Sequence, residues 1–79
     1  MDLEARAVAL LQQLIRHRTV NPPGDERAVQ ELLADALQEA GFEVTLIGRT
    51  EERPNLVARL RGRAEGPTLG LLSHVDTVP

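Results

Sequence analysis

The chain has 79 residues, a net charge of −3 and 42% apolar residues, and it contains no cysteine. This composition excludes disulfide bonds and thiolate metal sites, and it argues against a nucleic-acid partner. Because no apolar run is long enough to span a membrane and acidic residues precede the first apolar ones, we expect neither an anchor nor a secretory signal. The sequence therefore predicts a cytoplasmic protein.

Two helices are predicted in the first half of the chain. Apolar residues recur at spacings of three and four over residues 3–16 and again over residues 25–40. The stretch NPPG at 21–24 separates these segments, because two prolines and a glycine cannot continue a helix. Gly41 is well placed to end the second helix, and Phe42 can then fold back as the apolar contact that often follows.

Three strands are predicted in the second half. From Phe42 to Leu46 apolar and polar residues alternate, which is typical of a strand with one buried face. Residues 56–60 form the second predicted strand, and we expect it to pair antiparallel with the first. Residues 68–73 form the third, whose nearly continuous apolar run predicts burial on both faces. The fold class is therefore α/β, in the order helix, helix, strand, strand, strand.

A histidine and an aspartate, His74 and Asp76, follow the third predicted strand. In an extended segment, residues two apart point to the same side, so the carboxylate can reach the imidazole. A carboxylate bound to one ring nitrogen fixes the tautomer and leaves the other nitrogen free for a metal ion. The tripeptide alone favours a structural or surface role, since so short a motif often occurs by chance.

The surroundings of this motif make it more specific. The sequence SHVDTVP after an apolar strand, with NPPG upstream, resembles the start of one metallopeptidase family. This family comprises the zinc aminoacylases, acetylornithine deacetylases, succinyl-diaminopimelate desuccinylases and carboxypeptidase G. The resemblance implies that residues 1–79 are the N-terminal part of a mixed-sheet catalytic domain, without the dimerisation domain. It also implies that His74 is a zinc ligand and that Asp76 is the active-site carboxylate that orients it.

The function that the resemblance implies is metal-dependent hydrolysis of an amide bond. The substrates would be N-acyl amino acids or small peptides, as for a deacetylase, a desuccinylase or a carboxypeptidase. The parent protein would be a homodimer with two zinc ions per site, or cobalt in their place. The glutamate base and the remaining ligands would lie beyond Pro79, so the 79 residues alone would be inactive. The alternative is a non-catalytic α/β module, or a truncated gene product, that binds a protein partner through an open sheet edge.

Other polar residues have simpler interpretations. His17 follows the first predicted helix between two arginines, and a solvated helix end explains it without a metal. Arg59, Arg61 and Arg63 alternate along a strand end and loop, where charges commonly protect a sheet edge, although they could also meet an anion. The turn at 21–24 could lie near the rim of an active site, but joining two helices is enough to account for it.

Overall fold

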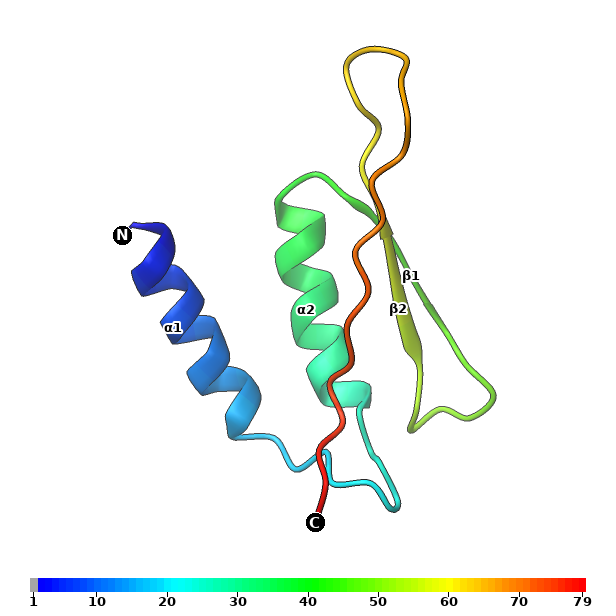
Figure 1. Ribbon diagram of the computed structural model, residues 1–79. Coiled ribbons are helices and arrows are strands. Elements are labelled where there is room, and N and C mark those ends of the chain that lie inside the picture. Colours follow the sequence, from blue (N-terminus) through cyan, green and yellow to red (C-terminus); the bar gives the residue numbers. More distant parts are fainter. Residues whose placement is uncertain (1) are drawn as a thin grey trace.

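The computed structural model describes residues 2–79, which form two helices followed by a two-stranded sheet (Figure 1). The elements are α1 (Leu3–Ile15), α2 (Arg27–Glu39), β1 (Glu43–Ile47) and β2 (Asn55–Arg59). The predicted α/β class, both helices and the first two strands are thereby confirmed. Within the described residues, no helix combines the length and apolar character that crossing a membrane requires.

Each helix has a local signal at one end. The side chain of Asp2 caps α1 by accepting a hydrogen bond from the backbone N–H of Ala5, at 2.8 Å. After α2, Gly41 adopts a φ of +97°, which glycine reaches without a steric penalty. The N–H groups of Gly41 and Phe42 then donate to the carbonyls of Gln38 and Leu37, which closes the helix as predicted.

The sheet is a single antiparallel pair that α2 covers on one face. Glu43 lies opposite Arg59 and Ile47 opposite Asn55, which confirms the predicted antiparallel pairing. Exposed and half-buried residues alternate along both strands, and α2 contacts both of them. The buried apolar residues Val29 and Ala34 lie on α2, so the small core is built around this helix.

The predicted third strand, residues 68–73, is not formed in this structure. These residues have no strand partner, and Leu69, Leu71 and Leu72 are almost fully exposed. The prediction of a strand buried on both faces is therefore wrong for the described chain. The physical reason is that a strand depends on hydrogen bonds to a neighbour, and no segment of residues 2–79 pairs with this one.

The C-terminal residues instead attach to the turn between the helices. Thr77 forms a parallel bridge with Val20, its N–H donates to the carbonyl of Thr19 at 3.0 Å, and its carbonyl accepts from Asn21 at 2.8 Å. The buried hydroxyl of Thr19 donates to the carbonyl of Val75 at 2.8 Å. In Figure 1 the red end of the chain accordingly lies against the cyan turn. This attachment brings residues 74–76 beside the NPPG turn.

Candidate metal centre

The predicted contact between His74 and Asp76 is present. Nδ1 of His74 lies 2.9 Å from Oδ1 of Asp76 and 3.1 Å from the backbone oxygen of the same residue. Both neighbours are acceptors, so a neutral imidazole in this geometry carries its proton on Nδ1 and donates it to Asp76. Nε2 then keeps its lone pair, which is the form of histidine that binds a metal ion.

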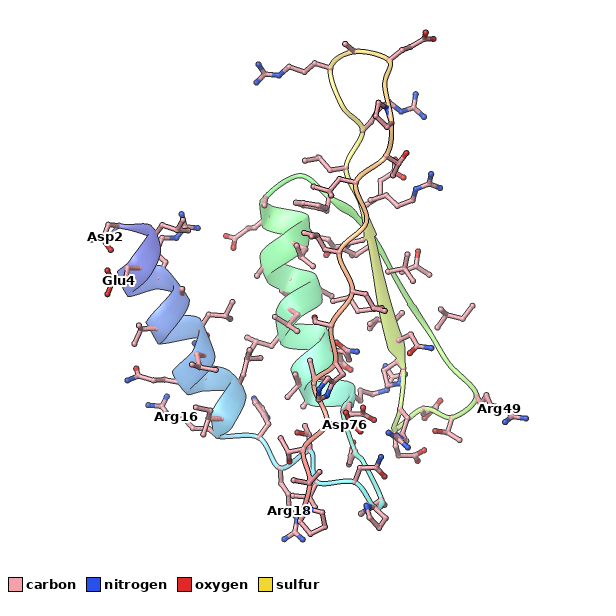
Figure 2. The ribbon with its side chains drawn as sticks, in the orientation of Figure 1. Asp2, Glu4, Arg16, Arg18, Arg49 and Asp76 are labelled. Carbon is pink, nitrogen blue, oxygen red and sulfur yellow. The ribbon has the colours of Figure 1, made fainter. Side chains whose placement is uncertain are left out.

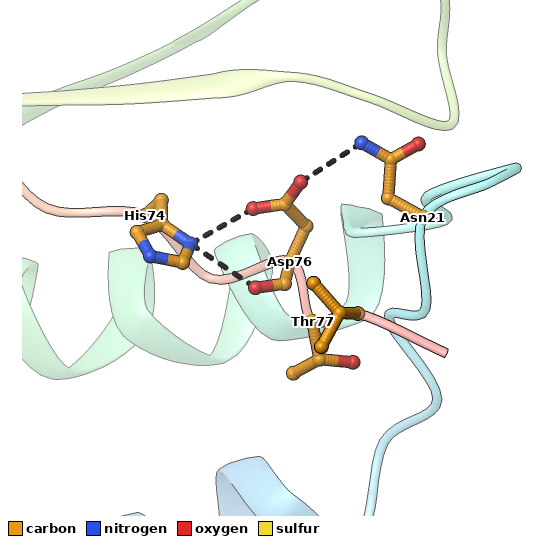
Figure 3. A pocket seen from close by; sticks show the side chains of 5 residues that line it. Asn21, His74, Asp76 and Thr77 are labelled. Atoms are coloured by element: carbon orange, nitrogen blue, oxygen red, sulfur yellow. Dashed lines mark hydrogen bonds and ion pairs between the residues drawn. The ribbon is translucent and has the colours of Figure 1, made fainter.

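Two further side chains hold the other oxygen of Asp76. The amide nitrogen of Asn21 donates to Oδ2 at 3.0 Å, and a guanidinium nitrogen of Arg53 lies 3.6 Å from the same atom. Figure 3 shows the carboxylate between the histidine ring on one side and the Asn21 amide on the other. Asp76 is thus bound by residues from the helix–helix turn and from the β1–β2 loop.

Arg53 is itself held in place by Glu26, the residue that precedes α2. Its Nε lies 2.6 Å from Oε1 of Glu26, whose carboxylate therefore does not cap α2. Gly24 leaves room for the guanidinium, because a Cβ there would lie 2.8 Å from Arg53 atoms. In Figure 2 the other arginine of this loop, Arg49, points outward at its tip, far from Asp76.

These contacts favour the charged form of the aspartate. Hydrogen bonds from Asn21 and from His74, together with the charge of Arg53, hold the pKa of Asp76 below its ordinary value. Because the pKa is lowered by folding, the contacts stabilise the fold above the unfolded pKa of about 3.9. That stabilisation is lost as the pH falls through the lowered pKa. At neutral pH Asp76 is therefore a carboxylate, as an orienting acceptor must be.

The donor set fits one ligand of a zinc site. The side chain of His74 is 85% exposed, while that of Asp76 is 26% exposed and already bound on both oxygens. Imidazole nitrogen is a preferred zinc ligand, and the ring is oriented from behind as such ligands usually are. Among residues 2–79, no three histidine or carboxylate side chains gather closely enough to hold an ion. Further ligands would have to come from outside these residues.

The remaining residues considered from the sequence lie elsewhere. His17 is exposed beyond the end of α1, and Arg59, Arg61 and Arg63 are exposed at the end of β2 and in the loop that follows. No pattern in the sequence indicates that Arg53 reaches Asp76, and Asn21 was assigned only to a turn. Both contacts join residues more than twenty positions apart, so no local pattern could reveal them.

Comparison with known proteins identifies relatives of this chain. A succinyl-diaminopimelate desuccinylase of Leptothrix cholodnii is 40% identical over 75 residues, which cover 91% of this chain and 19% of that enzyme. The desuccinylase of Paracoccus denitrificans is 44% identical over 70 residues, covering 89% of this chain and 17% of the enzyme. That of Methylobacterium radiotolerans is 38% identical over 77 residues, covering 92% and 19%. No family model and no solved structure matches.

These relatives are named as desuccinylases. This α/β chain with its His–Asp pair is therefore related to a class of amide-hydrolysing enzymes. More particularly, the chain is related to the succinyl-diaminopimelate desuccinylases, in agreement with the family resemblance of the motif SHVDTVP. The chain spans about one fifth of the length of the curated relatives it matches.

Proposed function

We propose that this chain is the N-terminal part of the catalytic domain of a zinc-dependent amide hydrolase, of the desuccinylase type. The observation that carries the proposal is the His74–Asp76 contact, which leaves Nε2 of the ring free, in a chain about 40% identical to desuccinylases. The substrate class is an N-acylated amino acid, and N-succinyl-diaminopimelate is the first to test. Deacetylase and carboxypeptidase activities are the neighbouring possibilities within the same chemistry.

The geometry supports a separate role for each of the two residues. His74 would contribute one ligand to the zinc site, and Asp76 would hold the ring with Nδ1 protonated, which leaves Nε2 free to bind the ion. Zinc, when bound, polarises a carbonyl group and lowers the pKa of water. The other ligands and the general base come from residues outside these 79, in a parent protein that we expect to hold two ions and to form a homodimer. Cobalt could take the place of zinc.

The test uses the complete product of the reading frame that encodes this chain. His74→Ala removes a ligand and should abolish zinc-dependent hydrolysis of N-succinyl-diaminopimelate. Asp76→Ala removes the group behind the ligand and should lower zinc affinity or activity roughly 10- to 100-fold. His17→Ala is the matched control, because His17 is exposed and distant from the pair. Full activity in the His74→Ala variant would contradict the assignment.

A second measurement compares the 79-residue chain with the complete protein. The 79 residues offer one ligand, whereas a catalytic zinc ion normally takes three from protein. We therefore expect only weak zinc binding and no hydrolysis from the 79 residues alone, measured by calorimetric titration and by the same assay. Tight, stoichiometric zinc binding by the 79-residue chain would show that the site is complete without further ligands and that this proposal is wrong.

A further inference from the structure

We infer that Asn21, supported by Arg53, is the positioning residue that fixes the Asp76 carboxylate against His74. The inference rests on the proposed roles of His74 and Asp76 and extends them to two residues of other segments. The NPPG turn would then have a role in the site as well as joining α1 to α2.

The carboxylate is held at both ends by different partners. Oδ1 faces Nδ1 of His74 at 2.9 Å, while Oδ2 accepts from the Asn21 amide at 3.0 Å. A rotation that exchanged the two oxygens or turned the carboxylate away from the ring would break the bond to Asn21. The histidine side chain is far more exposed than the aspartate, so the aspartate is the anchored member of the pair. Its anchor therefore determines where the ring points.

Asn21 is suited to this task because its own backbone is fixed to the same segment. Its N–H donates to the carbonyl of Thr77, the residue after Asp76, at 2.8 Å. The neighbouring Val20 forms the bridge to Thr77. The backbone of Asn21 therefore has a fixed position relative to Asp76. A turn that only joined two helices would not need the Asn21 amide to bind a carboxylate.

Arg53 supplies the weaker support. Its guanidinium lies between Glu26, at 2.6 Å, and Asp76, at 3.6 Å, in the space that Gly24 leaves open. The longer distance and a side chain that is 43% exposed make its attraction for Asp76 smaller than that of the Asn21 hydrogen bond. Arg53 therefore assists the orientation that Asn21 defines.

The test measures the ring of His74 in the metal-free, complete product of the reading frame. With histidine labelled with ¹⁵N, NMR reports the fraction of His74 that carries its proton on Nδ1, and His74→Gln assigns the signals. Asn21→Ala should lower this fraction toward the value in Asp76→Ala. Asn21→Leu fills the same space without a donor and should lower it equally. Asn55→Ala, the same change at the start of β2, should leave it unchanged.

Zinc affinity gives a second readout on the same variants. Direct partners of a metal ligand typically contribute roughly 10- to 100-fold, so we expect a loss of about 3- to 10-fold for Asn21, one step further out. Arg53→Gln should show a smaller loss, with Arg49→Gln, in the same loop, as its unchanged control.

Three outcomes would overturn the inference. The first is an unchanged tautomer in folded Asn21 variants, while Asp76→Ala alters it. The second is an effect of Asn21→Ala that Asn21→Leu does not share, which would reduce the role to packing. The third is loss of the folded spectrum in both variants, which would make Asn21 a folding residue. A protein that lacks hydrolysis but shows the Asn21-dependent tautomer would overturn the proposed function and leave the positioning role intact.

Discussion

The two helices have the same length and both carry an apolar stripe, yet only one of them is packed. α2 lies against β1 and β2, and its Val29 is 2% exposed. α1 has no buried residue, and its Val8 is 50% exposed. A periodic stripe therefore predicts that a helix forms and which face needs covering, but what covers that face depends on distant parts of the chain.

The same contrast separates the hairpin from residues 68–73. β1 and β2 satisfy each other's backbone groups and rest on α2, whereas the apolar residues of 68–73 have neither a strand partner nor a covering helix. Exposed leucines on an unpaired segment favour association with other strands. The exposed faces of α1 and of residues 68–73 are thus compatible with the proposal that more of a larger hydrolase surrounds them.

The largest expected effect tests the contrast between the helices with one substitution made twice. Val29→Asp places a charge without a partner at a buried position of α2, and should cost roughly 3–5 kcal/mol, enough to unfold so small a domain. Val8→Asp places the same charge on the exposed side of α1 and should change stability by about 0.5 kcal/mol or less. Circular dichroism during urea titration of the 79-residue chain measures both.

Equal losses from the two substitutions would break the comparison. They would mean that α1 packs in solution as firmly as α2, although its apolar residues are exposed in this structure. A loss for Val29→Asp alone would confirm that the folded unit is α2 with the hairpin.

The next effect compares two glycines with positive φ, one in the turn between the helices and one just after α2. Gly24, at φ +79°, lies under the Arg53 guanidinium, whereas a Cβ at Gly41, at φ +97°, would meet nothing within 4 Å. Each change to alanine carries the backbone cost, on the order of 1–3 kcal/mol. Gly24→Ala also displaces the guanidinium of Arg53, the end of a flexible side chain that can move away, so it should be the more costly by a small margin, as measured by denaturant unfolding.

The double variant Gly24→Ala/Arg53→Ala separates the two contributions to that cost. It removes the guanidinium that the new methyl group would meet, so Gly24→Ala should be less costly in an Arg53→Ala background than in the native chain. An identical cost in both backgrounds would show that Arg53 does not occupy the place above the turn.

The parts of the fold that could be predicted are those with local causes. The stripes of α1 and α2, the glycine stop at Gly41 and the alternation in β1 each arise from residues a few positions apart, and each is confirmed. The third strand could not be predicted correctly, because an apolar run signals a need for burial without showing that a partner is present.

The candidate site also combines a contact with a local cause and contacts that depend on distant parts of the chain. The approach of Asp76 to His74 follows from a spacing of two residues and is confirmed as a contact, while the zinc role of the pair stays a prediction. The hold of Asn21 and Arg53 on Asp76 depends on how the turn, the β1–β2 loop and the C-terminal segment meet. That meeting is a tertiary property, and the residue types alone do not reveal it.

The smallest expected effect concerns the attachment of the C-terminal segment to the turn. Thr19 is 4% exposed, and its hydroxyl donates to the carbonyl of Val75. Thr19→Val keeps the shape and removes this bond, which should cost about 1 kcal/mol. If the segment opens on its own, the N–H groups of Asn21 and Thr77 should exchange with solvent roughly fivefold faster, while the β1–β2 amides keep their rates.

The matched control is Thr45→Val, the same change at an exposed position of β1. It leaves the Thr19 hydroxyl in place, so the exchange rates of Asn21 and Thr77 should stay at their native values. Hydrogen exchange followed by NMR distinguishes the two variants residue by residue. A uniform acceleration in Thr19→Val, with the hairpin amides affected as much as Thr77, would show that the chain opens as one unit. The segment that carries His74 and Asp76 would then depend on the packed layer of α2 and the hairpin as well as on the turn.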